Sequence, residues 1–121
     1  MRIYISHSSD FSLGDTFYRP LKDSRLNTEH DFFLPHENEI NPETEDKLRN
    51  SDLVLAEVSK ESTRQGIELG LASSLGIPIV CAYKTGADSP RSLGSISKYF
   101  IEYSGAEDLA KQFTDFLGSN H

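Results

Sequence analysis

The sequence predicts an α/β protein with a flavodoxin-like, five-stranded parallel sheet in the order 2-1-3-4-5 and helices on both faces. Short, continuous apolar runs alternate with amphipathic stretches along the chain. Continuous apolar strands are typical of a parallel sheet that is covered on both sides. The length of 121 residues fits one domain, spanning 1–121.

Five runs have the length and composition of strands. They are Arg2–Ser6, Asp31–Leu34, Asp52–Val58, Ile77–Tyr83 and Tyr99–Tyr103. In a sheet of this order, ligands bind at the carboxyl ends of the strands, at the switch point between strands 1 and 3. The residues that follow the strands are therefore the first candidates for a site.

Local signals place the helices between these strands. A helix is expected after Ser12, and the pair Asn41–Pro42 is typical of another helix start. Capping boxes are indicated at Ser62 with Gln65 and at Ser104 with its partner Glu107. Each of these helices follows a strand, which completes the alternating pattern.

Two of the helices have a predicted buried side. The helix from Ser62 to about Ser74 should end at Gly76 and bury a stripe at four-residue spacing. That stripe consists of Ile67, Leu71 and Leu75. The last helix has an apolar face made of Leu109, Ala110, Phe113, Phe116 and Leu117.

Composition restricts the class of partner. The formal net charge is −7 and the pI is near 5.0, so the surface should repel a nucleic-acid backbone. No apolar run approaches the roughly 18 residues that span a bilayer, and the segment MRIYIS is typical of a strand rather than a signal peptide. The single cysteine, Cys81, excludes an internal disulfide and is predicted to be a small buried residue. We expect a cytoplasmic protein without a cofactor.

Four polar segments follow the predicted strands and should meet at one edge of the sheet. They are Ser6–Asp10, Pro35–Glu37, Ser59–Ser62 and Lys84–Gly86. The free N–H groups at a helix start suit a phosphate or a sugar hydroxyl. The alternative is that these serines cap helices and do nothing else.

Glu68 is the most informative single residue. It lies about two turns into a helix, in the segment GIELGLA, between two apolar neighbours. A carboxylate in such surroundings is costly to bury and is a candidate for chemistry. The alternative is an exposed helix residue that pairs with Arg64 one turn earlier.

The run SDLVLAEVSKESTRQGIELGLASSLGIPIVCAY resembles the nucleoside 2-deoxyribosyltransferase-like superfamily, and within it the 2'-deoxynucleoside 5'-phosphate N-hydrolases most closely. Those proteins carry a stretch of the form ADVVVAEVT-x-PS-x-G-x-G-x-ELG-x-A, which aligns without a gap from Asp52 to Ala72. The opening IYISHSS is similar to their first strand and loop, in which a Tyr and a Ser face the sugar. Tyr4 and Ser8 occupy those positions.

The resemblance implies a reaction and a set of residues. Glu68 is implied as the nucleophile that attacks the anomeric carbon of a (deoxy)nucleoside or its 5'-monophosphate and releases the base, with Tyr4 beside it. The phosphate-binding serines of the family fall on Ser62 and Ser92. Because the serine at Ser62 reaches the neighbouring subunit's phosphate site in the family, the resemblance also implies a homodimer, formed around the helices after strands 2 and 3.

Two departures from the family pattern leave the substrate open. The second acid of the family falls on Thr44, so Glu43 or Glu45 beside it would have to supply that role. In the first loop, His7 replaces a glycine, and Asp10 replaces an arginine and would oppose a phosphate.

A second resemblance gives alternatives. The segment ISHSSD is similar to the opening of Toll/interleukin-receptor domains, which share the fold and carry a Glu in a setting like that of Glu68. That resemblance implies either an NAD-cleaving domain or a non-catalytic nucleotide-binding or signalling module. The other candidates are weak: His7, His30, His36 and His121 lack metal-ligand spacing, although His36 could touch a base.

Overall fold

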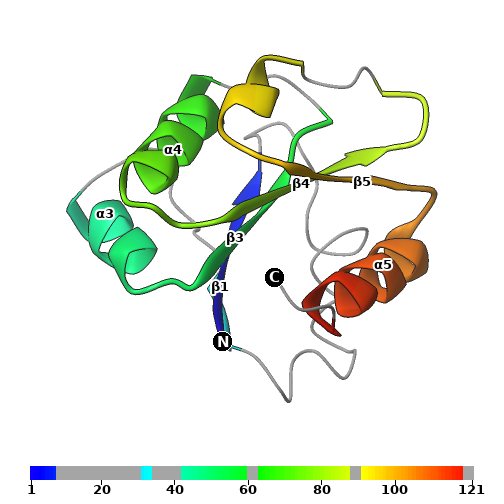
Figure 1. Cartoon of the computed structure of the whole chain (residues 1–121), viewed down its shortest axis with the longest axis horizontal. Coiled ribbons are helices and arrows are strands. Elements are labelled where there is room, and N and C mark those ends of the chain that lie inside the picture. The colour runs from blue at the N-terminus through cyan, green and yellow to red at the C-terminus, as the bar shows by residue number, and fades with distance from the viewer. Residues whose placement is uncertain (8–30, 34–41, 60–62, 88–90, 119–121) are drawn as a thin grey trace.

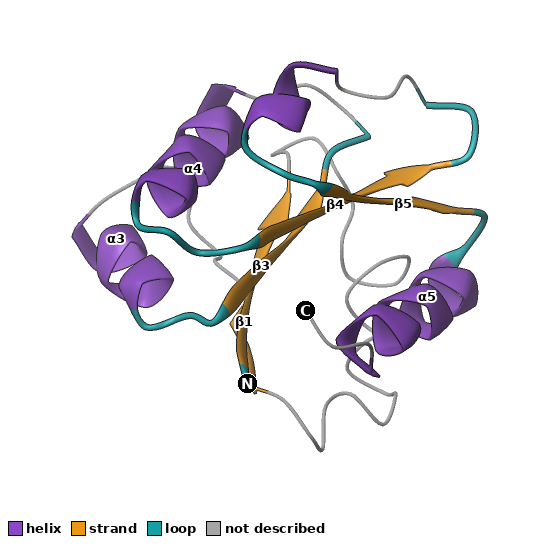
Figure 2. Cartoon of the chain, viewed as in Figure 1, coloured by secondary structure: helices purple, strands orange, loops and turns teal. Residues whose placement is uncertain are grey.

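The computed structural model describes residues 1–7, 31–33, 42–59, 63–87 and 91–118. The described strands form one parallel sheet in the order β2-β1-β3-β4-β5 (Figure 2). Their bounds are β1 Arg2–His7, β2 Asp31–Phe33, β3 Leu53–Glu57, β4 Ile79–Lys84 and β5 Tyr99–Tyr103. The predicted α/β fold with a parallel sheet is therefore confirmed, and all five carboxyl ends lie at the same edge.

Helices cover both faces of the sheet. Helices α3 and α4 lie on one side and α5 on the other (Figure 1). Their bounds are α3 Pro42–Arg49, α4 Thr63–Ser74 and α5 Ala106–Gly118, and a short 3-10 helix, η2, spans Arg91–Ser95. The helix expected after Ser12 falls outside the described residues. None of the described helices is long and apolar enough to cross a membrane.

The alternation of side chains along β1 divides the core into two clusters. Ile3 and Ile5 pack with Leu109 and Phe113 on the α5 side, which confirms the predicted apolar face of that helix. Tyr4 lies in the other cluster, with residues of α3 and α4. By the same alternation Ser6 faces the α4 side, so β1 offers two hydroxyls to that helix.

Helix α4 ends because the chain turns at Gly76. Gly76 has φ +76°, a left-handed conformation that costs a residue without Cβ little. The N–H of Ile77 donates to the carbonyl of Ala72 at 3.0 Å, and the N–H of Gly76 donates to that of Ser73 at 3.0 Å. This pair of bonds is a Schellman motif, as the predicted stop requires.

The predicted buried stripe of α4 is wrong at its first position. Ile67 is 55% exposed, and the buried residues of the helix are Gln65, Glu68, Leu69 and Ala72. Neighbouring residues in a helix are rotated by about 100° from each other, so the helix is turned by that amount from the expected orientation. The hydroxyls that β1 presents give the Glu68 carboxylate partners inside, which lets it take the inward position.

The cap of α5 also differs from the prediction. Ser104 pairs with Asp108 rather than with Glu107: its backbone N–H donates to the Asp108 carboxylate at 2.9 Å. The helix begins at Ala106, so Asp108 is its third residue, which is where a capping acid belongs. This backbone hydrogen bond is the main cause that lowers the pKa of the Asp108 carboxyl.

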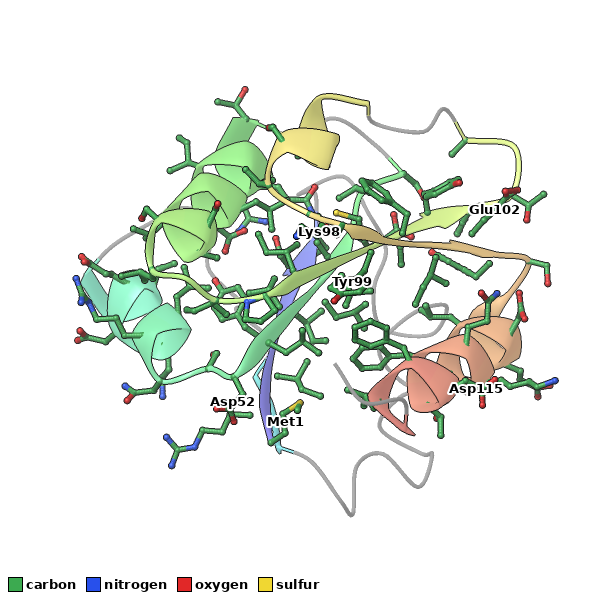
Figure 3. All side chains as sticks on the ribbon, in the orientation of Figure 1. Met1, Asp52, Lys98, Tyr99, Glu102 and Asp115 are labelled. Atoms are coloured by element: carbon green, nitrogen blue, oxygen red, sulfur yellow. The ribbon has the colours of Figure 1, made fainter. Side chains whose placement is uncertain are left out.

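Two further side chains, Asp52 and Cys81, have distinct surroundings in the sheet. At the amino ends of the strands, the N–H of Arg2 donates to Asp52 at 2.8 Å, and Figure 3 shows Asp52 beside Met1 there. In the middle, Cys81 is fully buried, as predicted. Burial raises the pKa of its thiol to about 11, partly opposed by a hydrogen bond with Ser97.

Candidate active site

Glu68 is buried under the carboxyl end of β1, with 2% of its surface exposed. The alternative of an exposed helix residue is therefore wrong, although Arg64 does lie close to it. A buried carboxylate needs partners that replace its hydration, because the desolvation cost is several kcal/mol. Among the described residues, side chains from β1 and from α4 itself provide those partners.

Two hydroxyls of β1 hold the two oxygens of Glu68. The Tyr4 hydroxyl donates to Oε2, as expected from the sequence, and the Ser6 hydroxyl donates to Oε1 at 3.2 Å. The two residues are separated by one position and so face the same side of the strand. Sequence reasoning missed the role of Ser6, although the two-residue period from Tyr4 could have indicated it.

Arg64 lies one turn before Glu68 on α4 and completes this group. Its Nη1 is 3.8 Å from Oε1 of Glu68, and its Nη2 donates to the carbonyl of His7 at 2.9 Å. The Arg64 side chain is 13% exposed. The guanidinium therefore joins the last residue of β1 to the first turn of α4, beside the buried carboxylate.

A second buried carboxylate, Glu57, was not singled out by the sequence analysis. It ends β3 on the α5 side of the sheet and is 1% exposed. The Tyr103 hydroxyl donates to one oxygen, and the backbone N–H of Ser59 donates to the other at 2.6 Å. Burial, followed by the hydrogen bond and charge of Glu57, raises the pKa of Tyr103 well above its ordinary value.

The two carboxylates are linked through Gln65. Its side chain is buried, and Nε2 donates to the backbone carbonyl of Glu57 at 2.8 Å. Because Gln65 belongs to α4, this bond fixes the helix that carries Glu68 to the end of β3. The start of α4 is thus tied to two strands, through Arg64 to β1 and through Gln65 to β3.

Other residues predicted for the site are placed in part or not at all. Ser8, His36 and Ser62 lie outside the described residues, as do the side chains of Ser92 and Glu43. His7 ends β1 and is half-buried, with its carbonyl bound to Arg64.

The region of the expected second acid is clearer. Thr44 is buried on α3, at 9% exposure. The neighbouring Glu45 accepts a hydrogen bond from Arg49 at 2.6 Å, and both side chains are largely exposed. Glu45 is therefore engaged on the outer side of α3. In the part of the chain that the structure describes, no cluster of His, Cys, Asp and Glu could hold a metal ion.

Comparison with known proteins confirms the resemblance to the nucleoside 2-deoxyribosyltransferase-like superfamily. Over 77 residues the chain is 35% identical to a protein of Syntrophotalea carbinolica that carries the provisional name 2'-deoxynucleoside 5'-phosphate N-hydrolase 1. The match covers 61% of this chain and 54% of that protein, so the chain spans about half the length of this relative. No protein-family model matches the chain.

A solved structure has the same fold as this chain. The CMP N-glycosidase BcmB of Clostridium botulinum matches with a TM-score of 0.64 at 18% identity. The match covers 94% of this chain and 98% of that one. The two proteins therefore share a fold along nearly their whole lengths.

Proposed function

We propose that this protein cleaves the N-glycosidic bond of a (deoxy)nucleoside or nucleoside 5'-monophosphate, with Glu68 as the nucleophile. The observation that carries the proposal is the buried Glu68 carboxylate, held by the hydroxyls of Tyr4 and Ser6 at the carboxyl edge of a parallel sheet. That edge, at the junction of β1 and β3, is where α/β sheets of this order bind ligands.

The chemistry suits a carboxylate. One oxygen of Glu68 bonds to C1′ of the sugar while the C1′–N bond breaks, and the electron pair leaves with the base, which takes up a proton. Water then attacks C1′ and releases the sugar from Glu68; in a transferase, a second base would take the place of water. A carboxylate stabilises the positive charge that develops on the sugar in both steps.

The relatives support this class of reaction. The names of the two relatives described above refer to cleavage of an N-glycosidic bond in a nucleotide, one by a hydrolase and one by a glycosidase. For this chain we propose Tyr4 and Glu68 as catalytic residues. His7, Ser8, His36, Ser62 and Ser92 are proposed to bind the substrate.

A second acid is proposed at Glu43. Glu45 is engaged by Arg49, which leaves Glu43 as the better of the two acids that flank Thr44. Glu43→Gln should then lower the rate of base release, while Glu45→Gln should leave it unchanged. Equal rates in the wild type and both variants would mean that no second acid operates here.

A homodimer through α4 is also proposed. The exposed positions of this helix carry no charge, and they are Thr63, Gly66, Ile67, Gly70 and Ser74. By contrast, α3 exposes Asp46, Lys47 and Arg49. An uncharged helix side with an exposed isoleucine suits a contact between copies. Sedimentation should give a dimer for the wild type and a monomer for Ile67→Lys; a monomeric wild type at tens of micromolar would contradict the proposal.

The test of function is a substrate panel. Nucleosides, ribo- and deoxynucleoside 5'-monophosphates and NAD are incubated with the protein, and free base is measured by chromatography. Release from nucleosides or monophosphates, and none by Glu68→Gln, is the expected result. Cleavage of NAD alone would favour the alternative of a Toll/interleukin-receptor-like NAD-cleaving domain. Binding without cleavage would favour a non-catalytic module.

A further inference from the structure

Ser6 is a polar side chain at a level of the sheet that otherwise carries small side chains towards α4. It lies one residue before the end of β1 and is fully buried. The residues in register with it on β3 and β4 are Ala56 and Cys81, and both belong to the apolar cluster under α4. Because protein interiors are closely packed, a row of small side chains leaves room for another group. The Glu68 side chain comes from α4 and meets Ser6 there.

The hydrogen bond from Ser6 adds something that the Tyr4 hydroxyl alone does not provide. The terminal torsion of a glutamate is broad, so a carboxylate that is held at one oxygen can still turn about its own bond. Tyr4 holds Oε2 of Glu68, and Ser6 holds Oε1 at 3.2 Å. Two donors on two different oxygens define the plane of the carboxylate.

Both donors belong to a part of the molecule that is well fixed. Strand β1 lies between β2 and β3, and Ser6 itself is in register with Ala56. The Tyr4 side chain is also fully buried. Groups on strands hold their geometry more closely than groups on loops. The two hydroxyls therefore form a rigid frame against which the Glu68 carboxylate is oriented.

This orientation matters for the proposed reaction. The attacking oxygen has to direct a lone pair at C1′ of the sugar, and a misplacement of about 1 Å can cost about 10²-fold in rate. Each oxygen of a carboxylate has two lone pairs. An oxygen of Glu68 that accepts one hydrogen bond from β1 therefore retains a lone pair for the attack.

We propose that Ser6 is a positioning residue that, together with Tyr4, fixes the plane of the Glu68 carboxylate for attack on the sugar. This inference rests on the proposed function for its catalytic meaning, since it assigns a support to the proposed nucleophile. Its geometric content is the orientation of one side chain, which can be measured without any turnover.

The first measurement is the steady-state kinetics of base release by Ser6→Ala, on the nucleoside or monophosphate that the wild type cleaves fastest. The variant removes the hydroxyl and leaves an alanine beside Ala56. The kcat should fall by about 10-fold or more, because the carboxylate is less well oriented. The KM should change little, because no residue proposed to bind the substrate is altered. An unchanged kcat, with or without a change in KM, overturns the proposal.

Ser97→Ala is the matched control. Ser97 is also a buried serine, and its hydroxyl donates to the carbonyl of Ile79 at 2.6 Å. Because Ile79 begins β4, this bond lies at the edge of the sheet opposite to the candidate site. Ser97→Ala should lower the urea midpoint of unfolding and leave kcat unchanged. A loss of kcat as large as that in Ser6→Ala would show that any buried serine has this effect, and would overturn the proposal.

The second measurement is a pair of crystal structures without substrate, one of the wild type and one of Ser6→Ala. In the variant, the Glu68 carboxylate should be turned or spread over more than one orientation, while Oε2 keeps its bond to Tyr4. The same orientation of Glu68 in both structures overturns the proposal. A turned carboxylate in a protein that cleaves nothing supports the role of Ser6 and removes the proposed function instead.

Ser6→Cys is the second variant and decides if Ser6→Ala does not fold. It nearly keeps the size of the side chain but offers only a weak donor. Its kcat should fall and its Glu68 carboxylate should turn, as in Ser6→Ala. A kcat and an orientation of Glu68 equal to those of the wild type overturn the proposal.

Discussion

Among the described residues two glutamates are buried, one against each face of the sheet, and each accepts a hydrogen bond from a tyrosine. Glu57 is on the α5 side with Tyr103, and Glu68 is on the α4 side with Tyr4. Their second oxygens differ. That of Glu57 accepts a backbone N–H at 2.6 Å from Ser59, whereas that of Glu68 meets a serine hydroxyl at 3.2 Å and a guanidinium at 3.8 Å.

The difference separates a structural carboxylate from a candidate catalytic one. The backbone N–H that Glu57 binds belongs to Ser59, only two residues further along the chain. Its other partner, Tyr103, is part of the apolar core on the α5 side. The Glu57 carboxylate therefore closes the turn at the end of β3. By contrast, Glu68 lies on helix α4, and all of its described partners are side chains. Burial does not distinguish the two carboxylates, but the kind of donor does.

Replacing each glutamate by glutamine should give opposite results. Glu68→Gln should lower kcat by about 10³-fold or more, because an amide neither attacks the anomeric carbon nor stabilises its charge. Glu57→Gln should retain most activity and instead lower the free energy of unfolding by about 1–3 kcal/mol. Base-release rates and urea denaturation measure the two effects. A catalytic loss in Glu57→Gln as large as that in Glu68→Gln would invalidate the distinction.

Replacing the two tyrosines should likewise affect activity in one case and stability in the other. Tyr4→Phe removes a donor to the nucleophile and should lower kcat by about 10²-fold. Tyr103→Phe leaves one oxygen of buried Glu57 without this donor and should cost about 1–3 kcal/mol of stability with little change in kcat. Steady-state kinetics on both variants, with thermal unfolding as a check on folding, provides the comparison. Equal kinetic losses would contradict it.

The raised pKa of Tyr103 predicts a loss of stability in alkali. The ordinary value is 10.0 and the folded value is higher, so above about pH 10 the unfolded chain binds fewer protons than the folded one. Stability from this group is therefore present below that pH and is lost above it, by up to about 1.4 kcal/mol per pH unit. Tyr103→Phe should lack this part of the slope.

Urea unfolding between about pH 9 and pH 11 measures that slope. The buried thiol of Cys81, whose pKa is raised to about 11, adds its own loss of stability in this range. Both proteins contain Cys81, so the difference between the wild type and Tyr103→Phe isolates the tyrosine. Parallel curves for the two proteins would show that Tyr103 titrates normally.

A smaller effect is expected for Gln65, which links the helix that carries Glu68 to the backbone of Glu57. Gln65→Met keeps the volume of the buried side chain but loses the bond to the Glu57 carbonyl. Stability should fall by about 1 kcal/mol, and kcat by a few-fold, because α4 is then less firmly fixed against β3. A change confined to stability would mean that the Arg64 contact alone orients α4.

Much of the fold could be predicted from the sequence because strand and helix periodicities were clear and the glycine and proline signals were in place. The orientation of α4 could not. Its sequence offers two plausible inward sides, and the choice depends on the hydroxyls of Tyr4 and Ser6, which come from a distant strand. A pattern of apolar residues favours Ile67 inward, and tertiary hydrogen bonds favour Glu68.

The candidate site was predicted in part. Glu68 and Tyr4 were predicted through the resemblance, and the structure shows their side chains in contact, while their catalytic roles are proposals. Ser6 and Glu57 were not assigned roles, because their partners Glu68 and Tyr103 lie far along the chain. Arg64 was considered only as a partner of an exposed Glu68, and its bond to the His7 carbonyl joins distant parts of the chain. Glu57 did carry a signal: an acid inside the apolar run LVLAEV needs a buried partner, since a strand covered on both faces leaves it no access to water.

The contact between Tyr4 and Glu68 joins positions that are 64 residues apart, and that between Ser6 and Glu68 joins positions 62 apart. Neither half of the chain therefore contains the site. It assembles when β1 is seated between β2 and β3, a step of long loop closure that is slow compared with the formation of α4 itself. During refolding, helical signal should appear before base release does, so recovery of activity would time the insertion of the first strand.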